Sequence, residues 1–219
     1  MNQNMKSSLW PKAMTAVREC HLSLLSSDAP DAEAWKEAFS LVLDAIEEER
    51  KAQPDFASEL YALNEETGVE YAFEDIFEEY FDLLEKEDRW EDVIASSERM
   101  IKAFAWKDKA PSEYMFRKGN ALEHLKRYDE AAAFGKEWLE QYPDDLYAAA
   151  SNTFLAIETG RLEEAKAIVE KYMREELVCD DTNDTFFMAA FRLYEMTDNI
   201  YAKQRVEQKM AEYSRLISQ

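Results

Sequence analysis

Histidine and cysteine are the side chains most often used for nucleophilic, acid–base and zinc chemistry, and this chain has two of each. Neither His21 nor His124 stands in the HExxH or ExxH spacing that places metal ligands on one helix face. Cys20 and His21 are adjacent, so on a helix their side chains diverge by about 100° and cannot form a nucleophile–base pair. The second thiol, Cys179, has no nearby cysteine. We therefore expect no catalytic residues, no metal and no cofactor.

Carboxylates are the other chemical resource of the chain. There are 47 Asp and Glu residues against 26 Lys and Arg, a formal net charge of −21. Such a surface repels phosphate backbones and anionic membranes, so nucleic-acid and membrane partners are not expected, whereas cationic partners are compatible. The loop Asp180-Asp181-Thr182-Asn183-Asp184 resembles half a calcium loop but lacks its glycine and its distant glutamate. We predict that it caps a helix starting at Thr185.

The composition favours helices as the elements that position these side chains. Only 4 Gly and 5 Pro occur in 219 residues, too few for the frequent turns of a β-rich fold, and good helix formers dominate. The two cysteines are read as reduced thiols of a cytoplasmic protein. The first residues, MNQNMKSSLWPK, are not followed by the apolar run of a signal peptide. We predict an all-α fold.

A short phrase recurs along the chain, each time after a polar turn and an amphipathic helix. Its copies are Trp90-Glu91-Asp92-Val93, Tyr128-Asp129-Glu130-Ala131 and Leu162-Glu163-Glu164-Ala165. The copies begin 38 and then 34 residues apart, as the residue numbers give directly. A two-helix unit with a period of ~34 residues is typical of an α-solenoid, in which each pair buries its apolar stripe against the next.

The segment 112–145 resembles a tetratricopeptide repeat (TPR). The residues that carry the resemblance are Gly119-Asn120-Ala121-Leu122, Tyr128, Asp129-Glu130-Ala131-Ala132 and Tyr142-Pro143. In that family a small residue lies where the partner helix crosses, and a proline closes the unit; Gly119 and Pro143 correspond. The segments 74–107 and 146–179 match in part, and a last pair is expected at about 183–197 and 199–217. The repeats are degenerate, and the resemblance covers roughly residues 70–219.

The resemblance implies an α–α superhelix, a TPR-like solenoid of antiparallel helix pairs. It also implies a site, because the first helix of each pair lines the concave surface in that family. The implied lining residues are Asp75, Glu78, Asp82 and Glu85, then Glu113, Phe116, Asn120, Glu123 and His124, then Tyr147, Ala150, Phe154, Ile157 and Glu158. Such a groove is acidic at one end and more aromatic further along, which suits a peptide with basic groups and an apolar anchor. The alternative is that these positions are exposed without a ligand.

One branch of the family grips a chaperone's C-terminal carboxylate with a clamp of Lys, Asn and Arg. Asn120 stands at an asparagine position of that clamp, but Phe116 replaces the lysine and the neighbouring acids repel a carboxylate. Chaperone-tail binding is therefore not expected.

Residues 1–68 lack the repeated phrase but show helical spacing, and we predict helices at about 5–26, 31–51 and 56–64, with Asp31 as an N-cap. No linker rich in Gly, Ser or Pro divides the chain, so residues 1–219 are predicted to form one domain. In it, residues 1–68 pack on or cap the array formed by residues 69–219.

The leading functional hypothesis is a non-catalytic protein–protein interaction module that binds a polypeptide, with basic groups, in an acidic and aromatic groove. A homo-oligomeric scaffold that associates through Trp10 and Trp106, or a regulatory protein, is the alternative. A metal-dependent enzyme on a helical scaffold, with paired carboxylates as ligands, is the least favoured reading.

Overall fold

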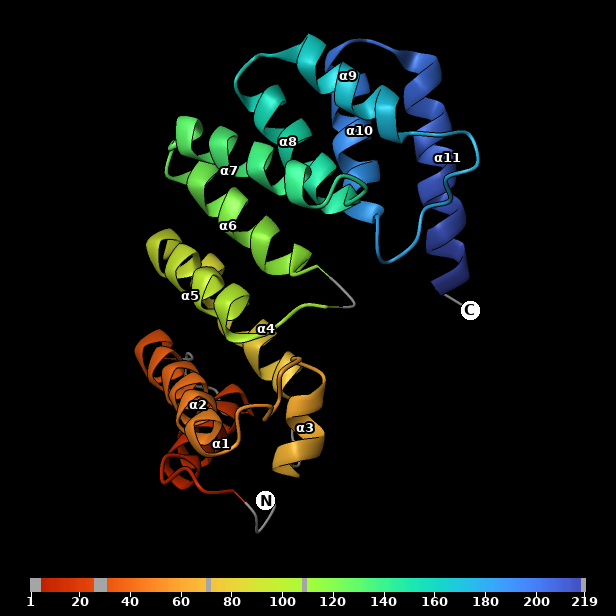
Figure 1. Ribbon diagram of the computed structural model, residues 1–219. Helices are drawn as coiled ribbons and strands as arrows, with labels where there is room; N and C mark the ends of the chain where they lie inside the picture. Colours follow the sequence, from red (N-terminus) through yellow and green to blue (C-terminus); the bar gives the residue numbers. More distant parts are fainter. Residues whose placement is uncertain (1–4, 26–30, 70–71, 108–109, 218–219) are drawn as a thin grey trace. The chain divides into compact units, whose positions relative to one another are not determined.

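The computed structural model describes residues 5–25, 31–69, 72–107 and 110–217 (Figure 1). Within these ranges it contains eleven α-helices and no β-strand, which confirms the predicted all-α class. Contacts divide the chain into two compact units, residues 1–110 and 111–219, called unit 1 and unit 2 below. The division falls after the first pair of the predicted array rather than at residue 68, and the single domain stays a prediction. None of the described helices is long and apolar enough to cross a membrane.

Unit 1 is built on an aromatic core. Its helices are α1 (Trp10–Leu25), α2 (Ala32–Ala52), α3 (Ala62–Thr67), α4 (Phe73–Lys86) and α5 (Trp90–Ala103). Helix α2 packs against α1 and α4, and α4 packs against α5. The ring of Phe39 on α2 contacts Phe77, Tyr80 and Phe81 on α4, with centroid distances between 4.7 and 6.1 Å. The three-and-four spacing of apolar residues along α4 therefore places one aromatic stripe against α2.

The N-terminus of unit 1 is held by a buried acid. Residues 5–9 were predicted as helix, but α1 begins at Trp10, because Glu49 of α2 accepts hydrogen bonds from the backbone N–H groups of Lys6 and Ser7 at 2.9 and 2.8 Å. The indole N–H of Trp10 also donates to Glu49, at 3.2 Å, and Trp10 is completely buried. Trp10 is thus a core residue, and its prediction as an exposed anchor for self-association was wrong. Trp106 is half-buried and donates its indole N–H to the carbonyl of Ile101.

The predicted helix at 56–64 is replaced by a turn and a shorter helix. Helix α3 begins only at Ala62, and Ala57 has a positive φ of 42°. The guanidinium of Arg50 donates to the carbonyls of Phe56, Ala57 and Ala103, which fixes this turn against the end of α5. Those carbonyls are consequently not available to a helix. The predicted cap at Asp31 is confirmed, since its carboxylate accepts the N–H of Glu33 at the start of α2.

Unit 2 consists of three consecutive helix pairs. They are α6 (Ser112–His124) with α7 (Tyr128–Gln141), α8 (Leu146–Glu158) with α9 (Leu162–Tyr172), and α10 (Asp184–Met196) with α11 (Ile200–Ile217). Each helix packs against its partner, and the first helices also pack in sequence order, α6 on α8 and α8 on α10 (Figure 1). The first helices therefore form one continuous layer.

The same turn joins the helices of four successive pairs, one in unit 1 and three in unit 2. Each turn has one residue in the left-handed region, where φ lies between 52° and 72°; these residues are Asp88, Lys126, Gly160 and Asp198. The N–H of the following residue donates to the carbonyl five positions back, as in Arg127 to Leu122 and Arg161 to Ala156. This is the hydrogen-bond pattern of a Schellman C-cap, which ends one helix and directs the chain into the next. Because the left-handed residue marks the same position in every pair, the pairs can be aligned residue by residue, including the last one.

Small residues allow the helices of unit 2 to approach closely. A Cβ added at Gly119 would lie 2.8 Å from the hydroxyl of Ser151 on α8, and 4.0 Å from Phe134 on α7. The sequence pattern pointed to the crossing with α7, whereas the tightest approach is to α8, the next first helix. At Gly135 an added Cβ would lie 2.5 Å from the Asn152 side chain. These contacts make α8 the central helix of the unit.

Candidate functional site

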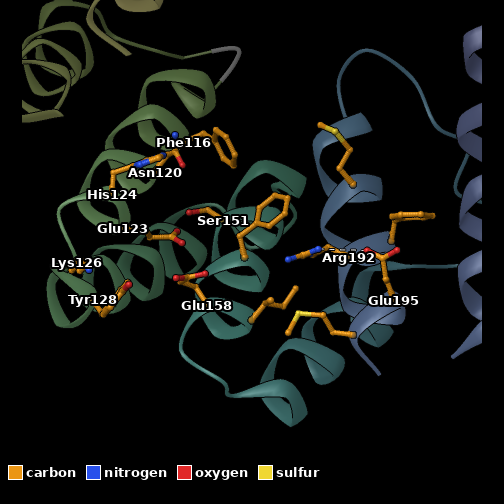
Figure 2. A pocket seen from close by; sticks show the side chains of 15 residues that line it. Phe116, Asn120, Glu123, His124, Lys126, Tyr128, Ser151, Glu158, Arg192 and Glu195 are labelled. Carbon is orange, nitrogen blue, oxygen red and sulfur yellow. Dashed lines mark hydrogen bonds and ion pairs between the residues drawn. The ribbon is translucent and has the colours of Figure 1, made fainter. Parts of the chain in front are cut away.

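The first-helix layer of unit 2 carries a hollow of about 930 Å³, which we call the unit 2 groove (Figure 2). Helix α6 contributes Phe116, Asn120, Glu123 and His124 to its lining. Helix α8 contributes Ser151, Phe154, Ile157 and Glu158. Helix α10 contributes Met188, Phe191, Arg192, Glu195 and Met196, and the α6–α7 turn and the start of α7 add Lys126 and Tyr128. The groove thus spans all three pairs of the unit.

The repeated turn explains why these residues share one face. Counted back from the left-handed residue of each turn, Asn120, Phe154 and Arg192 occupy the same position, six residues earlier. The positions three and four residues further along complete one helix face on each helix. Since α6, α8 and α10 pack side by side, the three faces join into a single surface.

The apolar wall of the groove consists of aromatic and methionine side chains. Phe116 packs edge-on against Tyr147, with centroids 5.9 Å apart and planes at 67°. Phe154 and Phe191 are half-buried, and Met188 remains 45% exposed. Exposed methionine beside aromatic rings is a surface that can adapt its shape to a ligand. A hollow with mainly apolar walls and a few polar groups is the usual form of a binding site.

Two carboxylates, Glu123 on α6 and Glu158 on α8, lie across from each other in the groove (Figure 2). Burial, and to a smaller extent the neighbouring charge of Glu158, raises the pKa of Glu123 to about 7. Within the part of the chain that the structure describes, neither a hydrogen bond nor a cation lowers this pKa. A negative charge nearby and partial withdrawal from water both disfavour the ionised form of a carboxyl group. At neutral pH, Glu123 is therefore close to half-protonated.

The cation on the α10 side of the groove, Arg192, has a carboxylate partner on its own helix. Arg192 lies 3.5 Å from Glu195 on the same helix, and Glu195 also pairs with Lys203 at 2.8 Å. These cations lower the pKa of Glu195, in contrast to Glu123. Lys203 additionally lies 4.7 Å from the centre of the Phe191 ring. The α10 side of the groove is thus internally compensated, whereas the carboxylates of α6 and α8 are not.

Seven of the residues implied by the TPR resemblance line the groove, and Ile157 is one of them. The others are Phe116, Asn120, Glu123, His124, Phe154 and Glu158. Tyr147 lies behind Phe116 instead of in the lining, and Glu113 is exposed, with its carboxylate 3.3 Å from Arg117. Ala150 is completely buried, so its placement on the groove surface was wrong. Its small side chain belongs to the helix contacts at the centre of the unit.

The four acidic candidates of α4 belong to unit 1. Asp75, Glu78 and Asp82 are exposed on α4, and Glu85 is half-buried. Their place in a binding surface stays a prediction, because the groove described above is formed by unit 2 alone.

The residues that α10 contributes to the groove were not predicted from the sequence. Met188, Arg192 and Glu195 have the same spacing as Phe116, Asn120 and Glu123. The signal was present, but the last pair could be aligned in two ways that differ by one residue. The left-handed residue Asp198 decides between them. Aspartate adopts that conformation more often than most residues, but its residue type alone does not fix it.

The remaining candidates for chemistry do not line the groove. Burial, and to a smaller extent nearby carboxylates, raises the pKa of both Cys20 and Cys179 to about 11, so both thiols stay protonated. His21 lies 3.9 Å from Glu79, on α1 and α4. Among the described residues, no three His, Cys, Asp or Glu side chains are placed to hold a metal ion. The loop at residues 180–183 leads into α10, with Asn183 at the N-cap position and Asp184 in the first turn.

Comparisons with protein-family models, with curated proteins and with solved structures found no match to this chain.

Proposed function

We propose that this chain is a non-catalytic, TPR-like interaction module that binds a polypeptide partner in the unit 2 groove. The observation that carries the proposal is the groove itself: about 930 Å³ in volume, lined by aromatic, methionine and charged side chains, on the layer of first helices. In an array of helix pairs this is the layer that forms the concave flank. The repeated Schellman turns, which keep successive pairs in register, support the superhelical arrangement.

The partner is a segment of polypeptide with an apolar anchor and basic groups. Phe116, Phe154 and Met188 offer an apolar surface for such an anchor, and aromatic contacts of this kind dominate the energetics of protein interfaces. Charge supports the basic groups, since the chain has a net charge of −21. The same charge disfavours nucleic acid and anionic membranes as partners. We place the module in the cytoplasm, on the basis of its two unpaired, buried cysteines.

The proposal is tested by selecting ligands from a random 12-residue peptide display library with the full chain as bait. Selected peptides are synthesised, and their affinities are measured by calorimetry for the wild type and for Phe154→Ala and Met188→Gln. We expect each substitution to weaken binding by about tenfold or more, because each removes part of the apolar wall. Val178→Gln is the control, since Val178 is 66% exposed and lies outside the groove.

Two results would contradict the proposal. One is a library that yields no peptide with measurable affinity. The other is a set of peptides whose binding is unaffected by Phe154→Ala and Met188→Gln while the variants retain wild-type helicity.

A second arm of the same experiment asks whether the ligand extends over α4. The double reversal Glu78→Lys with Asp82→Lys exchanges two exposed acids of unit 1 for bases. If the bound segment reaches α4, the affinity for basic peptides falls and depends less on salt, while helicity and melting temperature stay nearly unchanged. Unchanged affinity limits the site to unit 2.

Self-association is a second candidate function, favoured by the exposed apolar side chains of α11. Tyr201 is 85% exposed, Ile200 is 64% exposed, and Leu216 and Ile217 are exposed to a similar extent near the end of the helix. Light scattering between low and high protein concentration distinguishes the two functions, because a scaffold forms a concentration-dependent dimer that Tyr201→Glu weakens. A monomer at all concentrations leaves peptide binding as the function.

A further inference from the structure

We propose that Glu123 and Glu158 together form a seat for one lysine or arginine side chain of the bound peptide. This refinement rests on the peptide-binding function proposed above. It adds the chemical identity of one ligand group, the place where that group lies, and the release of a proton that accompanies its binding.

The first argument is geometric. Glu123 and Glu158 come from adjacent helices, α6 and α8, and both line the groove, where their carboxylates face the same space (Figure 2). Glu123 is half-buried and Glu158 is exposed, so the pair leads from the surface of the groove to its floor. A basic side chain that enters between them can donate to both carboxylates.

The second argument is that no positive charge among the described residues lowers the pKa of Glu123. The other charged and titratable groups that line the groove are Glu158 on α8, His124 on α6, Lys126 in the α6–α7 turn, Tyr128 on α7, and Arg192 and Glu195 on α10. Of these, only Glu158 changes the pKa of Glu123, and it acts in the direction of repulsion. Arg192 points into the groove from α10 (Figure 2), but it is paired with Glu195. A carboxylate pair without a counter-charge is stabilised by any cation that enters.

The third argument is the surface around the pair. Phe154 and Ile157 lie on α8 beside Glu158, and both line the groove. Lysine and arginine carry a long aliphatic stem that packs on apolar surface while the charged end reaches a polar group. The groove therefore matches both the aliphatic stem and the charged end of a basic side chain. A metal ion or a small inorganic cation has no such stem and would leave the apolar surface unused.

Binding of the cation releases a proton. In the unliganded groove, Glu123 has a pKa of about 7 and is partly protonated at neutral pH. The incoming positive charge lowers that pKa and the proton leaves to solvent, so no bond of the peptide changes. Ionised Glu123 is the binding form, so affinity rises with pH. A pKa near 7 corresponds to an affinity about tenfold higher at pH 8 than at pH 6.

The experiment uses the full chain and the peptides selected from the 12-residue library at pH 8. For each binding peptide, a second version is synthesised in which its lysines and arginines are replaced one at a time by norleucine. We expect one replacement per peptide to weaken binding by about tenfold, and the same loss with Glu123→Gln or Glu158→Gln. In the variants, that replacement should have little further effect, because the partner of the base is already removed.

Glu137→Gln is the matched control. Glu137 is an exposed acid on α7, outside the groove, and the substitution makes the same change in net charge. If general attraction to the acidic chain explains the effect, Glu137→Gln weakens binding as much as Glu123→Gln does, and the seat is disproved. Calorimetry at pH 7 in two buffers of different ionisation enthalpy should give about half a proton released per peptide, and none with Glu123→Gln.

The outcomes separate the two proposals. Peptides that bind in the groove but contain no base, or whose bases can be replaced without loss, overturn the seat and leave the peptide-binding function intact. Binding that releases no proton and does not change between pH 6 and pH 8 overturns the exchange at Glu123. Failure of every library peptide to bind overturns the function, and the seat with it.

Discussion

Two carboxylates withdrawn from water, Glu49 in unit 1 and Glu123 in unit 2, have pKa shifts of opposite sign. Burial raises the pKa of both. At Glu49, hydrogen bonds from the backbone of Ser7 and Lys6 and from the side chains of Gln53 and Trp10 outweigh that effect and lower the pKa. At Glu123 no such donor is present, and Glu158 raises the pKa further.

The difference shows how a carboxylate serves structure in one region and is suited to binding in the other. Glu49 is completely buried and accepts hydrogen bonds from four residues, so its charge is solvated by the protein and fixes the N-terminal segment to α2. Glu123 is half-buried in a groove and its charge is not balanced. The donors that the chain provides to Glu49 must come to Glu123 from a ligand.

The largest effect is expected from Glu49→Ala. The substitution leaves two backbone N–H groups and the indole of Trp10 without an acceptor inside unit 1. We expect a loss of at least about 3 kcal/mol in the free energy of unfolding of unit 1. Amide hydrogen exchange of α1 and α2 in the full chain measures it. Glu47→Ala, an exposed acid on the same helix, is the control, and an equal loss there would contradict a specific role of Glu49.

Acid is expected to destabilise unit 1 by protonating Glu49. Because the pKa of Glu49 is lowered on folding, its stabilisation is fully present above the ordinary value of 4.5 and is lost as pH falls through the folded value. Unfolding of unit 1, followed in urea from about pH 6 to about pH 3, should become easier in acid. In Glu49→Gln that part of the pH dependence should disappear. An unchanged slope in the variant would assign the acid sensitivity to other carboxylates.

Glu123→Gln is expected to stabilise the folded chain, in contrast to the substitutions of Glu49. Because the pKa of Glu123 is raised on folding to about 7, its neutral form favours the folded state, and stability is lost as pH rises from 4.5 towards 7. The neutral amide removes this penalty, so we expect a gain of about 1 kcal/mol at pH 8 and no gain near pH 4. Thermal unfolding at the two pH values measures it, with Glu137→Gln as the control. Destabilisation at pH 8 would mean that ionised Glu123 has a partner in the folded chain.

The smallest effect is expected from Gln53→Met, which sharpens the comparison at a single donor. Gln53 donates its side-chain N–H to Glu49 at 2.8 Å and is half-buried. Methionine keeps the volume and removes the donor, so unit 1 should lose less than about 1 kcal/mol, and the pKa of Glu49 should rise slightly. An NMR titration of the Glu49 carboxyl carbon measures the pKa. No change in that pKa would show that the backbone donors alone determine it.

Much of the fold could be predicted because its signals are local. The last pair was predicted at about 183–197 and 199–217 and is observed at Asp184–Met196 and Ile200–Ile217. The repeated phrase, the polar turns and the three-and-four spacing of apolar residues all act within one or two helical turns. The helix predicted at 56–64 failed because Arg50, which precedes it on α2, captures the carbonyls that the helix would need.

Half of the groove could be placed from the spacing within α6 and α8, because residues three and four apart share a helix face. The contribution of α10 could not, since the alignment of the last pair depended on a backbone conformation at Asp198. Trp10 was misread for a related reason. An aromatic residue next to a proline near the start of a chain has no local signal of burial, and its acceptor, Glu49, lies 39 residues away.

The sequence by itself determined that this chain is helical, acidic and organised in pairs, because composition and periodicity are properties of neighbouring residues. Only the tertiary structure decided which carboxylates are solvated by the protein. That depends on donors that mostly lie far away in the sequence: Lys6, Ser7 and Trp10, with nearby Gln53, donate to Glu49 in unit 1, whereas Glu123 in unit 2 meets another carboxylate across a groove. The two residues are the same type on similar helices, and their surroundings alone give one a structural role and suit the other to a ligand.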